Sequence, residues 1–305
     1  MINKIKNRIR SFFEITKLKK ENEEIKLILG KILININLEK NPTDISEIEF
    51  KIFSQFGDDG IIQFILSKLD LEDKYKNFIE FGVENYEESN TRFLLFNNNW
   101  SGLVIDSSQK NIDKIKNSNF FWKFDLDAIC SFITRDNINT LIANSKINKN
   151  IGLLSIDIDG NDYWVWEKIE EIDPHLVIIE YNSNFGFKNK ITVPYEENFI
   201  RNKAHFSNLY WGASLEALKF LGEKKNYKFI CTNSAGNNAY FIKSSEYNKL
   251  GLKLEKNFYS NKFRESRDKN GKKNYLSGEN KLKMINDLYV IDVEKNKKVK
   301  LKEIL

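Results

Sequence analysis

A regular alternation of strand-like and helix-like segments runs from residue 50 to residue 245, and it constrains the fold more than any other feature. Each strand-like segment is a short apolar run, and a segment with helical periodicity follows it. Strands that alternate with helices form a parallel sheet whose two faces are covered by the helices. The sequence therefore predicts parallel strands at residues 76–82, 101–106, 119–128, 151–159 and 174–182.

The last part of this region has a different pattern. Residues 227–233 and 238–244 are two apolar runs joined by a turn that contains Gly236 and Asn237, and this arrangement predicts a hairpin. The expected fold class is α/β: a Rossmann-like, mostly parallel sheet with a terminal antiparallel hairpin, plus an N-terminal helix. The expected helices inside the sheet region are residues 58–69, 88–99, 111–118, 137–146, 162–171 and 214–226.

Two further regions flank this domain, which we place at residues 46–248. Residues 1–45 are predicted to form an amphipathic or coiled-coil helix, and residues 249–305 form a basic C-terminal extension. Within the extension, residues 287–294 are a strand candidate. The rest of the extension has the Lys- and Asn-rich composition of a solvated or loosely packed tail.

The N-terminal helix carries a short heptad pattern. Asn22 occupies an a position, where a polar residue favours a parallel dimer in one register. Three heptads are short enough that the helix could instead pack on its own domain. A third interpretation places the apolar side chains of Ile5, Ile9, Phe12 and Phe13 on an anionic membrane surface. The heptad positions a and d are Ile15, Leu18, Asn22, Ile25, Leu29 and Ile32.

Composition excludes several classes of protein. The formal net charge is only +5, because acids nearly balance bases, and this argues against a nucleic-acid-binding surface. Two cysteines cannot build a disulfide framework, which suits a reducing cytoplasm. No window resembles a spanning helix. We expect a cytoplasmic protein, with contact to the inner face of the membrane as an additional possibility.

Polar side chains gather where the predicted parallel strands end. Because ligands of open parallel sheets bind outside the carboxyl ends of the strands, these residues predict a site at one edge. The dinucleotide motif G-x-G-x-x-G is absent after Gly82, which argues against NAD. A cationic ligand without a pyrophosphate, such as S-adenosylmethionine, suits such an acidic edge. The strand-end residues are Glu80, Asp106, Asp125, Asp157, Asp159, Glu180 and Asn182.

Several motifs resemble the class I S-adenosylmethionine-dependent methyltransferases, and more narrowly the FkbM-type group found in bacterial surface-polysaccharide loci. They are SQFGDDGII, FIEFGVEN, LSIDIDGNDYWVW, IIEYN, YWGASLEAL and NAYFI, in this order between residues 50 and 245. The resemblance implies a seven-stranded sheet that binds the cofactor across the first two strands. It departs from the usual pattern where Glu84 and Asn85 replace a second glycine.

The resemblance also implies roles for individual residues. Glu80 and Gly82 would line the methionine part of the cofactor, and Asp106 would bind the ribose. Asp125 would lie at the adenine edge, and Gln55 would cover the cofactor.

The acidic pairs at the ends of the fourth and fifth strands allow two interpretations. Asp157 and Asp159, together with Glu180 and Asn182, offer the oxygen ligands that Mg²⁺ or Mn²⁺ prefers. Alternatively, Asp157 binds the amino group of the cofactor and Asp159 acts directly as a base. His205, in the long insertion after the fifth strand, is a second candidate for the general base.

The expected function is transfer of a methyl group from S-adenosylmethionine to a hydroxyl, with a nucleotide sugar or surface glycan as acceptor. Methylation of a nitrogen or of another small molecule is the alternative within the enzymes. A methyltransferase fold that only binds a partner is the alternative from another class. The N-terminal helix adds a predicted homodimer.

Overall fold

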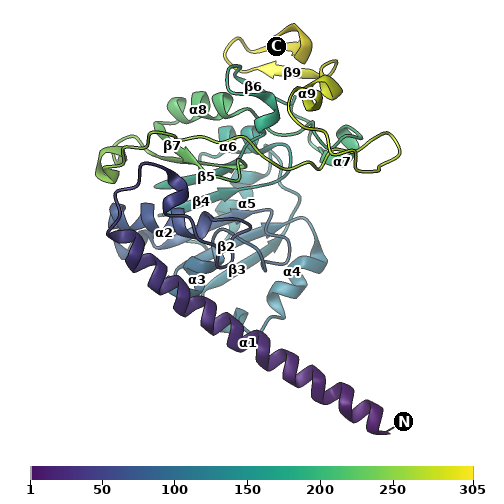
Figure 1. Ribbon diagram of the computed structural model, residues 1–305. Helices are drawn as coiled ribbons and strands as arrows, with labels where there is room; N and C mark the ends of the chain where they lie inside the picture. Colours follow the sequence, from purple (N-terminus) through teal and green to yellow (C-terminus); the bar gives the residue numbers. More distant parts are fainter. Residues whose placement is uncertain (1, 305) are drawn as a thin grey trace.

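The computed structural model describes residues 2–304, and within them the side chains of residue 14 and of residues 17–304. Its centre is a seven-stranded sheet in the order β3-β2-β1-β4-β5-β8-β7 (Figure 1). Only β8 runs antiparallel to its neighbours. The predicted mostly parallel sheet with a terminal hairpin is confirmed. The strands are β1 (Asn77–Phe81), β2 (Ser101–Asp106), β3 (Leu126–Cys130), β4 (Leu153–Ile156), β5 (Leu176–Glu180), β7 (Tyr227–Thr232) and β8 (Asn238–Lys243).

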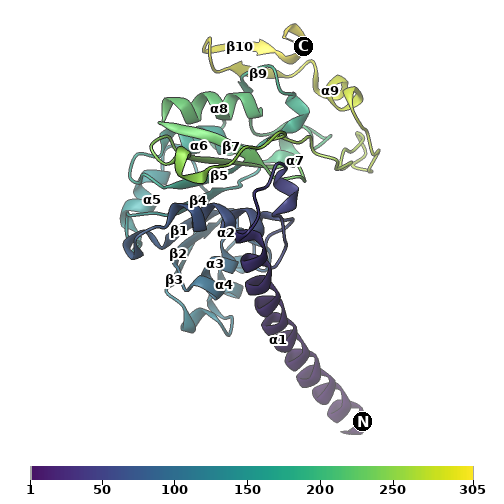
Figure 2. The ribbon, with the colours of Figure 1, turned by 60° about the vertical axis from the view of Figure 1, so that its left-hand side comes forward.

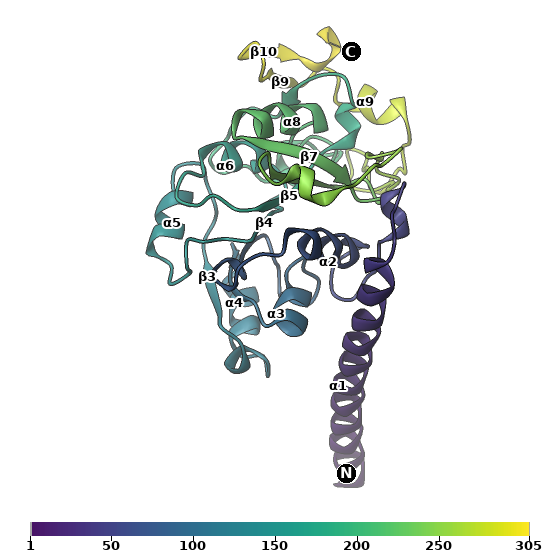
Figure 3. The same cartoon turned by 90° about the vertical axis from the view of Figure 1, so that its left-hand side faces the viewer.

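Helices cover both faces of the sheet because the central strands are apolar on both sides. Every residue of β1, β4 and β5 is buried. One apolar cluster packs under α2 (Asp58–Leu69), α3 (Arg92–Asn98) and α4 (Gln109–Lys116). A second packs under the helices of the opposite face (Figure 3). These are α5 (Ile138–Asn144), α6 (Asp162–Lys168) and α8 (Leu215–Lys224).

The predicted third strand, residues 119–128, begins too early. Residues Phe121–Lys123 form a short 3-10 helix, and β3 starts at Leu126. The apolar run misled because Phe120, Phe121 and Phe124 are partly buried against the first cluster without joining the sheet. Asp125 accepts a hydrogen bond from the Gly102 amide (2.9 Å) through its carbonyl, at the amino end of β2. It therefore lies at the edge of the sheet opposite the predicted site.

The C-terminal extension is not the solvated tail that its composition predicts. The strand candidate at residues 287–294 is confirmed as β9 (Tyr289–Asp292), which pairs with β10 (Lys297–Lys300) and with β6 (Ile191–Thr192). Figure 2 shows this second sheet beyond α8, near α9 (Glu279–Ile285). Ile285, Val290 and Leu301 share a buried core with residues of the 183–211 insertion. The extension therefore completes the fold.

A second part of the extension crosses the domain as a strap, which we define as residues 257–267. Its carbonyl at Asn257 accepts from the Thr232 amide (2.8 Å), and the Asn261 amide donates to the Ser183 hydroxyl (2.9 Å). At its far end the Arg267 amide donates to the Ser207 carbonyl (3.2 Å). The strap thus joins β7 to the insertion that follows β5.

Helix α1 (Ile2–Leu38) packs on the domain through its C-terminal half and projects from it toward the N-terminus (Figure 1). Glu23 forms an ion pair with Arg92 (2.6 Å), and the Asn37 amide group donates to the Ile48 carbonyl (2.7 Å). A Cβ on Gly30 would lie 2.5 Å from Phe93, so a glycine is needed at this close approach. Docking on its own domain is therefore confirmed for this half of the helix.

The opposite face of α1 remains apolar and exposed. Leu18, Ile25, Leu29 and Ile32 are between 49% and 63% exposed. They occupy the predicted a and d positions, whereas the docked residues Glu23 and Gly30 fall on b positions. Leu27 and Ile34 pack on the domain, so α1 has one docked and one exposed apolar face, and pairing between two copies stays a prediction. The side chains of Ile15, and of Ile5, Ile9, Phe12 and Phe13 in the membrane interpretation, lie outside the described residues.

Among the described residues, no helix has both the length and the apolar character that a membrane crossing requires.

We expect Leu301→Ala to lower the free energy of unfolding by about 2–4 kcal/mol, because Leu301 is fully buried in the core that the extension completes. Chemical denaturation followed by circular dichroism measures this. Lys297→Ala, at an exposed position of β10, is the matched control. Equal free energies of unfolding for both variants would indicate that the extension is a solvated tail and not part of the core.

We expect Ile25→Glu combined with Leu29→Glu to reduce the mass of the full chain in light scattering from dimer to monomer, because two charges enter an apolar seam. Lys31→Glu, which reverses a charge at an exposed c position, should leave the mass unchanged. These substitutions spare the docked face of α1, which deletion of the helix would remove. Identical masses for the unsubstituted chain and the double variant would contradict pairing through this face.

Candidate active site

A cavity of about 560 Å³ opens at the carboxyl ends of β1, β2, β4 and β5. The loop before α2 contributes Gln55 and Phe56, the β7–β8 turn contributes Asn237, and the strap contributes Phe263. Phe56 and Phe263 stack with ring centroids 4.9 Å apart. The cavity is strongly acidic, because Arg201 is the one basic side chain among its described lining residues, against eight carboxyl groups. These belong to Glu80, Glu84, Glu88, Asp106, Asp157, Asp159, Glu180 and Glu265.

The turn after β1 combines one required glycine with two other residues in left-handed backbone conformations. Gly82 has φ +74°, and a Cβ there would lie 1.6 Å from the Asp157 carbonyl, so packing against the end of β4 requires glycine. Glu84 and Tyr86 also adopt left-handed backbone conformations, with φ of 47° and 61°. Such conformations are costly for residues with side chains, and their presence beside a cavity is typical of a binding loop.

Glu80 organises the segment that enters α3. Its buried carboxylate accepts hydrogen bonds from the Asn90 amide (2.9 Å), from the Thr91 amide (3.1 Å) and from the Ser89 and Thr91 hydroxyls (both 2.5 Å). Burial raises the pKa of Glu80, and these donors oppose the shift. Glu80 lines the cavity as predicted, but its oxygens are already bound by its own chain.

Asp106, at the end of β2, joins the β1 turn to the start of α4. Its carboxylate accepts from the Glu84 amide (2.9 Å), the Ser108 amide (2.8 Å) and the Asn111 side chain (3.2 Å). A carboxylate has about four lone-pair sites, so an acceptor position is left for a ligand. Asp106 is 8% exposed and lines the cavity.

The first turn of α2 fixes the loop that carries Gln55. Asp59 accepts from the amides of residues 52–54 through one oxygen, at 2.7–2.8 Å. Burial raises the pKa of Asp59 to about 6 despite these donors. Asp58 accepts from Tyr240 (2.5 Å) and Asn238 (3.0 Å), so it ties α2 to the hairpin. The sequence pattern did not indicate these buried bonds.

The acidic cluster consists of Asp157, Asp159 and Glu180. Each offers an oxygen, and these oxygens lie within 4.8 Å of one another. Asp159 has φ +57°, in a loop whose Ile158 and Gly160 amides donate to the buried Asp162 (both 2.9 Å). Asp162 is thus a support of this loop, and Asn161 is the N-cap of α6.

The charges of the cluster oppose one another. Burial, together with the Asp159 and Asp162 carboxylates, raises the pKa of Asp157 well above its usual value. Burial and the Asp157 and Asp159 carboxylates do the same to the pKa of Glu180. Glu180 is 8% exposed, and its Oε2 accepts no hydrogen bond from the described residues. The cluster therefore needs a proton or a cation.

The hydrogen bonds of Asn182 do not support its predicted role as a metal ligand, which stays a prediction. Its fully buried side chain donates to the carbonyls of Leu209 and Trp211 (both 2.9 Å) and accepts from the Asn184 amide (3.0 Å). It holds the 183–211 insertion against β5. The spacing of an Asn two residues after a carboxylate is the same for a metal ligand and for a residue that supports a loop. Only the course of the 183–211 insertion distinguishes these two roles.

Two other predicted residues do not reach the cavity. Asp125 lies at the opposite edge of the sheet, and Ser131, Phe132 and Ile133 line the cavity after β3 in its place. His205 follows α7 (Arg201–Ala204) and shares a hydrogen bond with the Ser207 hydroxyl (2.7 Å). It is not among the described residues that line the cavity, and its assignment as general base stays a prediction.

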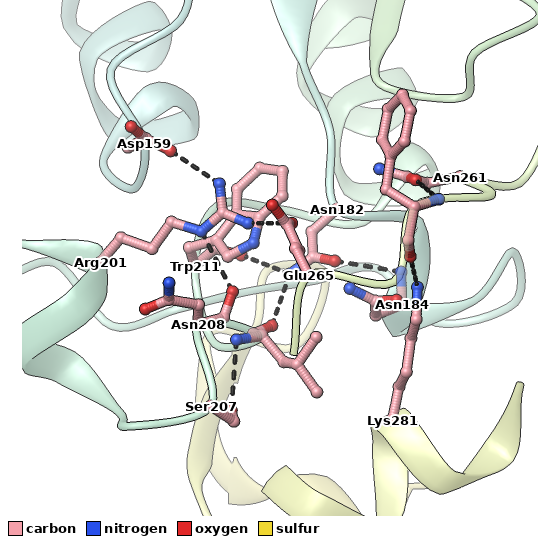
Figure 4. A network of polar contacts seen from close by, with 12 residues as sticks. Asp159, Asn182, Asn184, Arg201, Ser207, Asn208, Trp211, Asn261, Glu265 and Lys281 are labelled. Carbon is pink, nitrogen blue, oxygen red and sulfur yellow. Dashed lines mark hydrogen bonds and ion pairs between the residues drawn. The ribbon is translucent and has the colours of Figure 1, made fainter. Parts of the chain in front are cut away.

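Arg201 is the site residue that sequence reasoning missed. Its guanidinium donates to the Asp159 carboxylate (2.8 Å), binds Glu265 of the strap, and lies 4.4 Å above the Trp211 ring (Figure 4). A lone arginine in a polar insertion carries no pattern that links it to a strand end 42 positions earlier.

Comparisons with known proteins add little. No protein-family model and no curated protein matches the chain. An O-methyltransferase from Bacillus cereus, solved in complex with SAH, has 12% identity and a TM-score of 0.39, covering 73% of this chain and 91% of its own. A putative caffeoyl-CoA O-methyltransferase from Staphylococcus aureus has 15% identity and a TM-score of 0.42, covering 71% and 99%. These similarities are low, so the fold assignment rests on the strand order of the chain itself.

We expect Asp106→Asn to weaken binding of S-adenosylhomocysteine at least tenfold, about 1.4 kcal/mol, because an amide nitrogen cannot accept from a ribose hydroxyl or from the Glu84 amide. Isothermal titration calorimetry measures the affinity. Asp113→Asn, exposed on α4, is the control. Unchanged affinity in the Asp106 variant would remove this residue from the cofactor site.

Proposed function

We infer that this chain transfers a methyl group from S-adenosylmethionine to an acceptor hydroxyl. The observation that carries the proposal is the acidic cavity at the carboxyl ends of β1, β2, β4 and β5, with the buried Asp106 at its wall. It occurs in a seven-stranded sheet with one antiparallel strand, the arrangement that the methyltransferase resemblance implies. Ligands of open α/β sheets bind at this edge.

The residues of the cavity fit this cofactor. Asp106 offers a carboxylate acceptor to ribose hydroxyls, the turn at Gly82–Glu84 lies beside it, and Gln55 is among the lining residues. An excess of seven carboxyl groups over basic side chains suits a ligand with a positive sulfur. When bound, S-adenosylmethionine supplies the electrophilic methyl group.

The acidic cluster supplies the base. A hydroxyl held against Asp157, Asp159 or Glu180 can pass its proton to a carboxylate oxygen as its own oxygen becomes nucleophilic. The free Glu180 Oε2 is available for a hydrogen bond from such a hydroxyl. The cavity walls hold the acceptor hydroxyl in line with the methyl group and exclude water. Such positioning lowers the barrier to transfer.

The acceptor side of the cavity favours a polyhydroxylated molecule. Asn161, Asn237 and Asn261 line it, and an amide group can both donate and accept hydrogen bonds. The stacked Phe56–Phe263 pair adds an apolar wall. Amide and carboxyl groups that converge on one cavity can fix the orientation of a ligand with several hydroxyls. We therefore place a sugar hydroxyl, on a nucleotide sugar or a surface glycan, ahead of an amine.

We expect the purified chain to bind S-adenosylhomocysteine in calorimetry. We also expect it to convert S-adenosylmethionine to S-adenosylhomocysteine when nucleotide sugars or glycan fragments are present. Mass spectrometry detects the methylated product. Glu180→Gln should retain cofactor binding and lose turnover at least a hundredfold, since the cluster loses an acceptor for the proton. Glu223→Gln, distant from the cavity lining, is the control.

The outcomes separate the alternatives. Methylation of an amine and not of a hydroxyl would favour the N-methyltransferase. Cofactor binding without turnover on any acceptor would favour a binding subunit. Absence of cofactor binding would contradict the proposal as a whole.

A further inference from the structure

Arg201 is held in one orientation by contacts to all three of its guanidinium nitrogens. Nη1 donates to Asp159 Oδ1 (2.8 Å), Nε donates to the Asn208 carbonyl (3.1 Å), and Nη2 binds Glu265. The face of the guanidinium lies 4.4 Å above the Trp211 ring, a distance at which a cation is attracted to the aromatic face. Figure 4 shows the group between Asp159 and Glu265. Its side chain is 18% exposed.

The charge of Arg201 acts on the whole acidic cluster. Its positive charge opposes the upward pKa shifts of both Asp157 and Glu180. Burial alone would lower the pKa of Arg201, but Glu180, Glu265 and Asp159 raise it above its usual value. An arginine stays charged at any ordinary pH, so the cluster always faces a fixed cation.

The same geometry disfavours a divalent metal. Of the four predicted ligands, Asn182 is committed to the 183–211 insertion, and Asp159 is committed to Arg201. A metal bound to Asp157, Asp159 and Glu180 would sit beside the guanidinium that contacts one of its own ligands. The positive charges of the metal and of the neighbouring guanidinium would repel each other strongly in this partly buried site.

From these contacts we propose that Arg201 is the built-in counter-cation of the Asp157–Asp159–Glu180 cluster and takes the place of a divalent metal. Arg201 is a positioning residue: it fixes Asp159 and neutralises part of the cluster, while Glu180, whose Oε2 accepts no hydrogen bond from the described residues, lines the cavity. Glu265 makes the strap part of this device, because it holds the second guanidinium edge.

The test uses Mn²⁺ alone as the probe, with the full chain and no methyl acceptor, so that it does not depend on the proposed transfer reaction. Mn²⁺ binding is followed by electron paramagnetic resonance. The unsubstituted chain and Arg201→Lys should bind no Mn²⁺ at the cluster. Arg201→Met removes the charge and should bind Mn²⁺, with a dissociation constant at least tenfold below the highest Mn²⁺ concentration tested on the unsubstituted chain. Asp159→Asn in the Arg201→Met background should abolish that binding.

Lys203→Met, exposed in the same short helix, is the matched control and should behave as the unsubstituted chain. Mn²⁺ binding by the unsubstituted chain that Asp159→Asn removes would overturn the proposal, and so would equal Mn²⁺ affinities for a folded Arg201→Met variant and the unsubstituted chain. Should Arg201→Met fail to fold by circular dichroism, the titrations of the unsubstituted chain and Arg201→Lys still decide. Separate titration with S-adenosylhomocysteine reports on the proposed function alone.

Discussion

Carboxylates at the ends of buried strands are the constraint on which the rest of this structure depends, since an ionised carboxylate is stable there only with partners. The chain supplies partners of two kinds. Backbone amides and hydroxyls bind Glu80, Asp59 and Asp106, and in doing so they fix the loops that shape the cavity. The remaining cluster at the end of β4 and β5 has one fixed cation, Arg201. The first group builds the walls, and the second group is left free for chemistry.

The elements that local sequence patterns determine could be predicted from the sequence. The alternation of apolar runs and helical periodicity placed the sheet correctly, and α2 begins and ends at the predicted residues, because local patterns determine these elements. β3 was placed too early because the aromatic side chains at residues 120–124 look the same in a strand and in a turn that packs on a core. The composition of residues 249–305 hid a real core because Ile285, Val290 and Leu301 are widely spaced among lysines.

The candidate site shows a sharper limit. Strand ends converge by topology, so Asp106, Asp157, Asp159 and Glu180 could be assembled at one edge from the chain order alone. Which of their oxygens stay free could not, because the partners come from distant segments that carry no motif. Arg201 is 42 residues from Asp159, and Glu265 a further 64 from Arg201. Sequence periodicity describes neighbours, whereas both ion pairs of Arg201 are long-range contacts.

The two sides of the cavity therefore depend on different parts of the chain. At one side, the side-chain hydrogen bonds of Asp106 involve only residues between 84 and 111. At the other side, Phe263 and Glu265 of the strap meet Phe56 and Arg201, so this wall exists only when the C-terminal extension is folded. The extension is anchored elsewhere by its own core with the 183–211 insertion. Changes in the strap can thus alter the wall that Phe263 and Glu265 form, and the position of Arg201, while the side-chain hydrogen bonds of Asp106 remain as they are.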